Sequence, residues 1–298
     1  MTANASVQQP RPRKIVDVLA AGTDYLSRHG VEHPRLALEH LLGHVLRCPR
    51  LELYLRFDTR LTDEQLADSR QGVQRLAAGE PLQYVIGETD FMGYPLRVDG
   101  RALIPRPETE VLVDEVLRFA PLWANARPVV ADIGTGSGCI AISLALKRRG
   151  AVQAVACDSD AAALTLAREN AQRHGGDGDV AFVRADLLQA MRPGSLGAAV
   201  SNLPYITTDD WSRLPKHIRD HEPRAALDGG ADGLSLIRRL VPEAAAAIAP
   251  GGFLFLEVGA GQPPEVRACL EANGFVDVRV VRDLAGRERV VCGTRRTP

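Results

Sequence analysis

The sequence predicts an α/β protein built on a doubly wound, mostly parallel β-sheet of the Rossmann-like kind, with a smaller helical domain before it. Two observations carry this prediction. A short apolar run at 129–133 passes through alternating glycines into a helix-patterned segment at 139–146, which is the strand–turn–helix unit of nucleotide-binding sheets. Beyond this unit, strand-like and helix-like segments alternate almost to the end of the chain.

The composition is that of a globular protein without an overall charge bias. Its 298 residues hold 36 Lys and Arg against 37 Asp and Glu, so no global basic field points to nucleic acid. No apolar run reaches membrane length, and the N-terminus lacks the apolar core of a signal peptide. The five cysteines are scattered and form no C-x-x-C pair, which favours reduced thiols. We therefore expect a cytoplasmic protein that binds neither a membrane nor a metal.

The first 80 residues carry helical patterns after a polar tail. We expect residues 1–12 to be disordered and residues 13–80 to form a helical domain that docks the substrate. Thr62, with Gln65 three positions later, predicts a capping box at a helix start. His40 and His44 lie one helical turn apart, but no second pair of ligands accompanies them, so we predict no metal site.

Residues 81–104 are expected to form a β-hairpin that links the two domains. Apolar residues alternate there between Leu82 and Val98, and glycines interrupt them. The stretch Ile-Pro-Arg-Pro-Glu-Thr-Glu at 104–110 follows, near the start of the second domain at 105–298. Its two prolines stiffen the approach to a helix, and its acids suit the first helical turn. We interpret it as a rigid strap over the mouth of a ligand site.

The second domain is expected to hold seven strands. After the strand at 129–133, the pattern predicts strands at 152–156, 180–183, 198–200 and 253–258, helices at 160–174, 234–248 and 264–272, and closing strands at 276–281 and 289–292. The tight Ala285-Gly286 connection indicates that the last two strands form an antiparallel hairpin at the sheet edge.

The glycine turn favours S-adenosylmethionine (SAM) over a dinucleotide as the ligand. Its spacing is G-x-G-x-G, and Cys139 occupies the position where a G-x-G-x-x-G fingerprint needs its third glycine. Asp132 precedes the turn, where a carboxylate would repel a pyrophosphate but suits the amino group of a zwitterionic ligand. We expect Asp132 and Gly134–Gly136 to hold the amino-acid end of SAM, because the glycines let the backbone approach it closely.

Acidic residues also follow the next two predicted strands. Asp158 ends the second strand, where its carboxylate is placed to accept both ribose hydroxyls. Asp186 and Leu187 end the third strand, where they would meet the adenine amino group and ring face. Because ligands of such sheets bind outside the carboxyl ends of the strands, acids in register favour a ligand site over surface turns.

The fourth strand leads into Asn202-Leu203-Pro204-Tyr205, beside the expected position of the methyl donor. An amide or aromatic amine is a poor nucleophile because its lone pair is delocalised. The Asn202 side-chain oxygen and a backbone carbonyl would each accept one hydrogen of such an –NH2 group and align its nitrogen with the sulfonium methyl. Tyr205 would pack on the planar target. An ordinary Asn-x-Pro turn is the alternative interpretation.

Together these motifs resemble those of the PrmC/HemK family, N5-glutamine methyltransferases of class-1 peptide chain release factors. The resemblance rests on IPRPETE, DIGTGSG, Asp158, Asp186 and N-x-P-Y, and it extends over nearly the whole chain. It implies the class I SAM-dependent methyltransferase fold, with S-adenosylhomocysteine as the product of the cofactor. It also implies that Asn202, Leu203, Pro204 and Tyr205 grip the glutamine of the Gly-Gly-Gln loop of the factor and serve as the catalytic residues.

The same resemblance implies a set of contacts to the two substrates. The expected SAM-binding residues are Asp132, Ile133, Gly134, Thr135, Gly136, Asp158, Leu187 and Asn202, with Asp186 beside them. We further expect Phe91 and Arg106 to bind the protein substrate. We expect a monomer that binds release factors and does not bind nucleic acid directly.

One residue departs from the family pattern. The family usually has Asn-Pro-Pro-Tyr, whereas this chain has Leu203 at the second position. Leucine still supplies the backbone carbonyl, and it is biased toward extended backbone because Pro204 follows it. We expect less preorganisation of Asn202, but no loss of the chemistry.

Two other functions remain open on the sequence. The string Asn-Leu-Pro-Tyr also occurs in ribosomal RNA adenine dimethyltransferases, so N6-methylation of adenine in RNA or DNA is one alternative. The near-neutral charge counts against it, because phosphate contacts dominate nucleic-acid affinity. A non-catalytic SAM-binding module that holds a translation factor is the other.

Overall fold

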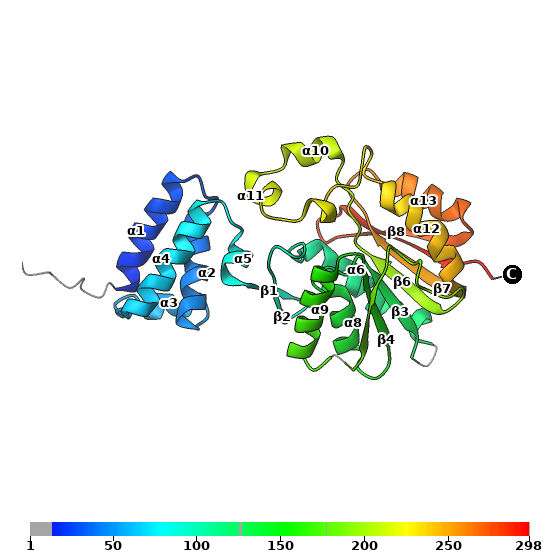
Figure 1. Cartoon of the computed structure of the whole chain (residues 1–298), viewed down its shortest axis with the longest axis horizontal. Helices are drawn as coiled ribbons and strands as arrows, with labels where there is room; N and C mark the ends of the chain where they lie inside the picture. Colours follow the sequence, from blue (N-terminus) through cyan, green and yellow to red (C-terminus); the bar gives the residue numbers. More distant parts are fainter. Residues whose placement is uncertain (1–13, 125–126, 177, 298) are drawn as a thin grey trace, which may run out of the picture. The chain divides into compact units, whose positions relative to one another are not determined.

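The computed structural model describes residues 14–124, 127–176 and 178–297, and the chain divides into two compact units, 1–87 and 88–298 (Figure 1). The tail expected at residues 1–12 lies outside the described residues. The first unit is helical, with α1 (Ile15–Arg28), α2 (Pro34–Leu46), α3 (Glu52–Leu55), α4 (Asp63–Ala77) and α5 (Leu82–Ile86). Leucines of α1, α2 and α4 form its buried core.

Local sequence signals set the ends of these helices. The Thr62 hydroxyl accepts from the Gln65 amide N–H, and the Gln65 side chain accepts from the Thr62 N–H, so the predicted capping box at the start of α4 is confirmed. The prediction of extended chain from residue 82 is wrong, because Leu82–Ile86 form α5. Leu82 and Val85, three positions apart, both pack on the helical core, and Gly87 ends the helix at φ +78°.

The second unit begins with the two-stranded antiparallel hairpin β1 (Glu88–Phe91) and β2 (Tyr94–Arg97). A seven-stranded sheet follows, in the order β5-β4-β3-β6-β7-β9-β8. Its strands are β3 (Val129–Ile133), β4 (Gln153–Asp158), β5 (Val180–Arg184), β6 (Leu196–Ser201), β7 (Ile248–Glu257), β8 (Phe275–Arg282) and β9 (Glu288–Arg295). The first five pair in parallel, whereas β9 pairs antiparallel with β7 and β8. The predicted fold class and the antiparallel edge hairpin are therefore confirmed.

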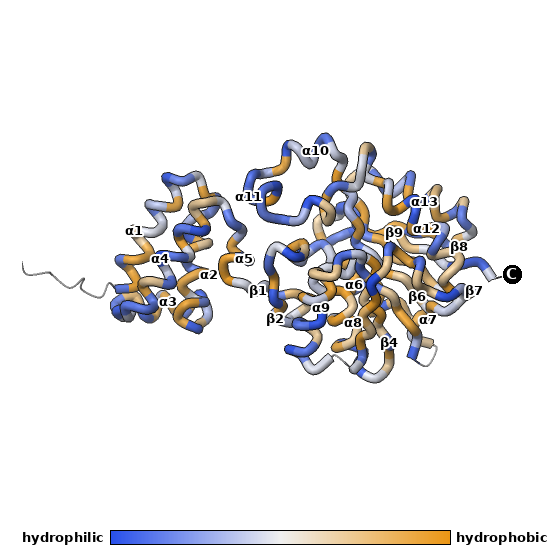
Figure 2. Tube along the Cα trace, in the orientation of Figure 1, coloured by the Kyte–Doolittle hydropathy of each residue, from blue (hydrophilic) through white to orange (hydrophobic). Residues whose placement is uncertain are grey.

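Helices cover both faces of the sheet because the strand residues alternate in direction. Val130 packs with α6 (Pro107–Arg118) and α8 (Cys139–Lys147), whereas its neighbours Ala131 and Ile133 pack with α12 (Ser235–Ala247) and α13 (Pro263–Ala272). The elements α7 (Ala120–Trp123) and α9 (Ala161–Arg173) complete the layers. Figure 2 shows the strands β3, β4 and β6 as predominantly hydrophobic, as expected for a sheet buried on both faces.

The connection between β6 and α12 is the least regular part of the second unit. It holds α10 (Thr208–Arg213), α11 (Lys216–Arg219) and the short 3-10 helix η1 (Arg224–Ala226). The segment around α11 is largely hydrophilic (Figure 2). Three residues that follow α11 nevertheless line the cavity described below: Pro223, Ala225 and Ala226.

No described helix has the length and apolar character needed to cross a bilayer. No three His, Cys, Asp or Glu side chains in the described ranges gather as metal ligands would, and both His40 and His44 are exposed.

Candidate active site

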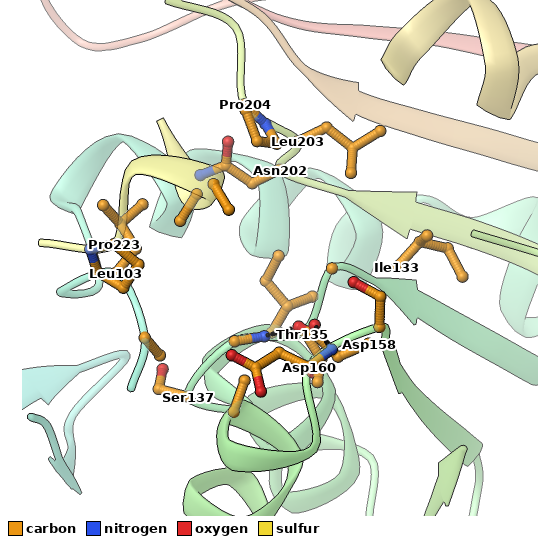
Figure 3. A pocket seen from close by; sticks show the side chains of 18 of the residues that line it. Leu103, Ile133, Thr135, Ser137, Asp158, Asp160, Asn202, Leu203, Pro204 and Pro223 are labelled. Atoms are coloured by element: carbon orange, nitrogen blue, oxygen red, sulfur yellow. Dashed lines mark hydrogen bonds between the residues drawn. The ribbon is translucent and has the colours of Figure 1, made fainter. Parts of the chain in front are cut away.

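The main cavity lies at the carboxyl ends of β3, β4 and β6, in the second unit. Its lining comes from the glycine turn, the ends of β4 and β5, the strap, the segment after β6 and the loop before α12; among the residues are Leu103, Arg106, Thr109, Ile133, Gly134, Thr135, Gly136, Asp158, Asp186, Leu187, Asn202, Leu203, Pro204 and Pro223. In Figure 3, Asn202 and Pro204 lie on one side of the cavity, and Asp158 and Asp160 lie on the other. Most of the predicted site residues thus meet in one place.

The glycine turn is tied to the end of β4 by its backbone. The Gly134 and Thr135 N–H groups donate to the Cys157 carbonyl at 2.9 and 3.0 Å, and the Gly136 N–H donates to Asp158 Oδ2 at 2.9 Å. Gly134 and Gly136 have φ of +71° and +55°, in the left-handed region that favours glycine. The turn is therefore held open toward the cavity by bonds to the neighbouring strand.

Asp132 lies behind this turn and does not line the cavity. It is 1% exposed, and its Oδ2 accepts from the Thr135 hydroxyl at 2.5 Å and from the Ala141 N–H at 3.1 Å. Burial raises the pKa of Asp132 to about 7, although these two hydrogen bonds oppose the shift. In this structure Asp132 Oδ2 braces the glycine turn against α8, and Oδ1 has no hydrogen-bond partner among the described residues. The SAM contact expected for Asp132 stays a prediction.

Asp158 lines the cavity and presents its carboxyl at the end of β4. Besides the bond from Gly136, its Oδ1 accepts from the Asp160 N–H at 2.9 Å. Each carboxylate oxygen accepts more than one hydrogen bond, so both oxygens keep capacity for the hydroxyls of a ligand. The two hydrogen bonds from the backbone fix the orientation of the carboxyl and leave both of its oxygens able to accept further hydrogen bonds.

Asp186 and Leu187 line the cavity beside the end of β5. The Asp186 carboxylate accepts from the Arg239 guanidinium at 2.6 Å and is half exposed. Leu187 is buried, with a φ of +51°, an uncommon conformation for a residue with a branched side chain. Such a backbone outlier beside a cavity is typical of a ligand site.

Asn202 is held by the strap. Its side-chain Nδ2 donates to the Thr109 hydroxyl at 2.9 Å, and Thr109 belongs to the first turn of α6. No described residue hydrogen-bonds the amide oxygen, Oδ1. The strap residue Thr109 thus occupies the donor end of the amide and leaves the acceptor end for a ligand.

A second cavity shares part of its lining with the first. Six residues line both cavities: Leu103, Arg106, Asn202, Leu203, Pro204 and Ala226. The lining of the second is completed by Tyr205, Ile206, Leu214, Ile218 and Leu227. The Tyr205 hydroxyl donates to Glu257 Oε1 at 3.3 Å, and the Gln262 side chain donates to the Tyr205 carbonyl at 2.9 Å. Two ligands that meet at Asn202 are therefore accommodated by the shape of the site.

The strap is fastened to the loop before α12 by an ion pair. Arg106 donates to the carboxylate of Glu222 at 2.5 Å, and the Ile104 N–H donates to the same carboxylate at 3.3 Å. Glu222 is buried, and Arg106 lines both cavities. Arg106 therefore holds the wall of the site in place, and this contact was not foreseen from the sequence.

Phe91 does not reach either cavity. It is 1% exposed and belongs to the core cluster that includes Leu112 and Val113 of α6. The substrate contact expected for Phe91 is contradicted by this burial. Its position at the end of β1 instead anchors the hairpin on the helix that carries Thr109.

The donor set fits SAM, the group that the motifs imply. The Asp158 carboxyl, held at the end of β4, suits a ribose. The glycine turn suits an amino-acid chain, because it leaves room that a Cβ at Gly134, 3.3 Å from Leu203, would close. The buried Leu187 suits an adenine. Asp158 and the turn would hold this group, which supplies a methyl on a positively charged sulfur. A sheet of this topology with this cavity defines a class I SAM-dependent methyltransferase.

Comparisons with known proteins identify the family. The family models for the PrmC N-terminal domain and the methyltransferase small domain match residues 17–87 and 109–214. A release factor glutamine methyltransferase of Geobacter sulfurreducens is 42% identical over 96% of this chain and 98% of its own, and one of Moorella thermoacetica is 42% identical over 91% and 95%. The chain belongs to the release factor glutamine methyltransferase family.

The fold also matches a solved structure. A methyltransferase from Pyrococcus furiosus superposes with a TM-score of 0.50 and 14% identity, covering 79% of this chain and 100% of that one. At this identity the match concerns the fold alone. The prediction of a SAM-dependent enzyme of this family is thus confirmed by the family relatives, over both the RNA or DNA methyltransferase and the non-catalytic alternative.

Proposed function

We propose that this chain transfers a methyl group from SAM to the side-chain amide nitrogen of the glutamine in the Gly-Gly-Gln loop of class-1 peptide chain release factors. The observation that carries the proposal is the position of Asn202 between two cavities, with its amide nitrogen bound to Thr109 and its oxygen available. The oxygen is an acceptor for one hydrogen of a substrate –NH2 group.

The site supports direct transfer. A glutamine amide entering the second cavity meets apolar walls and the ring of Tyr205, whose hydroxyl is bonded away to Glu257. Oδ1 of Asn202 and the backbone carbonyl of Leu203 would hold the two amide hydrogens and favour the positive charge that develops on the nitrogen. The nitrogen gains the methyl and loses one proton, and the sulfur keeps the electron pair of the broken bond.

The first unit has a separate role in this proposal. We assign residues 13–80 to docking of the protein substrate, residues 81–104 to linking and residues 105–298 to the chemistry, in a monomer that acts in the cytoplasm. The match of residues 17–87 to the PrmC N-terminal domain supports this division, since a relative named release factor glutamine methyltransferase matches nearly the whole chain, these residues included.

The test is methyl transfer from labelled SAM to three acceptors: a purified release factor, the same factor with its loop glutamine changed to alanine, and a structured RNA. Label on the intact factor alone, located to the glutamine by mass spectrometry, is the expected result. Label on the RNA, or equal label on both factors, would refute the proposed substrate.

A further inference from the structure

One buried side chain of α9 is bonded to two segments that form the wall of the main cavity. Asn170 is 0% exposed and does not itself line this cavity. Its Nδ2 donates to the Ser137 carbonyl at 2.9 Å and to the Arg97 carbonyl at 3.1 Å, and its Oδ1 accepts from the Arg97 N–H at 2.7 Å. Both hydrogens of the amide and one acceptor site are therefore used in bonds to the backbone.

The first of these segments is the end of the glycine turn. Ser137 is 2% exposed and lines the cavity (Figure 3). In a regular helix its carbonyl would accept from the Ala141 N–H, four positions later, but that N–H donates to Asp132 Oδ2 at 3.1 Å. Asn170 therefore supplies the hydrogen bond that helix geometry does not give this carbonyl.

The peptide group between Ser137 and Gly138 carries this hold to the residues that face a ligand. Its carbonyl is bonded to Asn170, and its N–H, on Gly138, donates to the Thr135 carbonyl at 2.8 Å. A peptide group is planar, so a bond that fixes its oxygen also fixes its N–H. Thr135 and Gly136 line the cavity. Asn170 thus orients the part of the turn that we expect to hold the amino-acid end of SAM.

The second segment, residues 97–103, leads from β2 to the strap and contributes to the cavity wall. Ala102 lies against the glycine turn, since a Cβ added at Gly136 would come within 3.7 Å of its side chain. Glu169, the residue before Asn170, accepts from the Arg101 guanidinium at 2.9 and 3.0 Å. Two successive residues of α9 therefore fasten this segment beside the turn.

We propose that Asn170 is a positioning residue for SAM: its amide holds the glycine turn and residues 97–103 at the spacing that fits the amino-acid end of the cofactor. It acts through the backbone of Ser137 and Arg97. The inference rests on the proposed function in one respect, because SAM must bind in the main cavity with its amino-acid end at the turn. It does not depend on which group accepts the methyl.

A truncated ligand distinguishes this role from a general structural one. S-adenosylhomocysteine carries the amino-acid chain, whereas methylthioadenosine has the adenine, ribose and sulfur without it. Asn170→Leu removes all three hydrogen bonds at a similar volume. By calorimetry we expect its Kd for S-adenosylhomocysteine to rise at least about tenfold and its Kd for methylthioadenosine to rise less than about threefold, because Asp158 and Leu187 are unchanged. Equal rises for the two ligands, or an unchanged Kd for S-adenosylhomocysteine, would overturn the proposal.

His174→Ala is the matched control. The His174 Nε2 donates to the Pro95 carbonyl at 2.8 Å, so it joins α9 to the same hairpin through a residue outside the glycine turn. We expect its Kd for both ligands to stay within about twofold of the wild type. If His174→Ala weakened S-adenosylhomocysteine as much as Asn170→Leu does, any loosened contact between α9 and the hairpin would have this effect, and the proposal would be wrong.

Asn170→Ala keeps the test decisive if Asn170→Leu does not fold. Its smaller side chain leaves room for water to pair the Ser137 and Arg97 groups, and the bonds of Glu169 and His174 still hold α9 to this region. We expect a rise of at least about threefold in the Kd for S-adenosylhomocysteine and no rise for methylthioadenosine. Urea titration checks that each variant is folded, and equal changes for the two ligands would again overturn the proposal.

The binding and labelling assays together distinguish failure of this inference from failure of the proposed function. If the wild type binds S-adenosylhomocysteine more tightly than methylthioadenosine but does not label the release factor, the proposed acceptor is wrong and the binding data still test Asn170. If the wild type labels the factor and Asn170→Leu weakens both ligands equally, only this inference is wrong. A wild type that binds the two ligands equally would show that the turn does not hold the amino-acid end, which also overturns the inference.

Discussion

Arg106 and Glu222 form an ion pair at 2.5 Å across 116 positions of chain, and it joins the strap to the loop before α12. The Glu222 carboxylate is buried, whereas Arg106 is partly exposed at the cavity. The pair therefore links the two segments that form this wall of the active site.

Removing Arg106 should destabilise this wall. In Arg106→Ala, Glu222 keeps the Ile104 N–H as its one partner among the described residues. We expect a loss of about 2–3 kcal/mol in the free energy of unfolding, typical of a buried charge left underpaired. Urea titration measures it. The double variant Arg106→Ala/Glu222→Gln should recover part of the loss; no recovery would show that the ion pair is not the cause.

Gly138 should be required for packing rather than for ligand binding. Its φ is +82°, and an added Cβ would lie 2.7 Å from Ile142 and 3.0 Å from Ala167 on α9. We expect Gly138→Ala to lower the free energy of unfolding by about 2–3 kcal/mol, the sum of backbone strain and steric overlap. Gly175→Ala is the matched control, because it has φ +62° and open space around its Cβ. Equal losses in the two variants would contradict the packing role.

Asp158 should carry much of the SAM affinity. In Asp158→Asn a single oxygen must replace two that accept from Gly136 and Asp160, so the turn loosens and the ligand loses an acceptor. We expect the Kd for SAM by calorimetry to rise at least about tenfold. Asp68→Asn, at an exposed position of α4, is the control: it makes the same charge change and should leave the Kd for SAM unchanged. An unchanged Kd in Asp158→Asn would remove Asp158 from the cofactor site.

Asp132 should give folding stability a distinctive pH dependence. Its pKa is raised by burial to about 7 from an ordinary value of 3.8, so between these values the folded state keeps a proton that the unfolded state has lost. The stabilising contribution is present below about pH 4 and is lost as the pH rises through about 7. Asp132→Asn cannot titrate, so the variant should gain stability relative to the wild type over this range, by up to roughly 1.4 kcal/mol per pH unit. Urea titrations at pH 5, 6, 7 and 8 measure the difference, and a constant difference would exclude the raised pKa.

Much of the fold could be predicted because its signals are local. The G-x-G-x-G turn, the acids that end β4 and β5 and the Thr62–Gln65 capping box each lie within a few residues of the structure they specify. The strand prediction from apolar alternation was wrong at Leu82–Ile86. A segment of five residues fits both the strand period and the helix period, and it is helical because Leu82 and Val85 pack on the helical core.

The site contacts that escaped prediction are those between distant segments. Thr109 and Asn202 are separated by 93 positions, and their hydrogen bond depends on how α6 lies against the end of β6. Asp132 and Phe91 have residue types suited to binding, yet both are buried, which follows from three-dimensional packing and not from sequence pattern. The Pro-Arg-Pro-Glu-Thr motif indicated that the strap matters, but not that its Thr109 holds the amide of Asn202.

The central claim is that Asn202 holds the substrate amide while Asp158 and the glycine turn hold SAM. The most direct measurement is methyl transfer to the release factor by Asn202→Ala, with the Kd for SAM determined on the same preparation. We expect transfer to fall below detection while the Kd rises by less than about threefold, because the contacts of Asp158 and Gly136 are unchanged. Substantial transfer by the variant, or a SAM affinity that collapses together with activity, would contradict this division of roles.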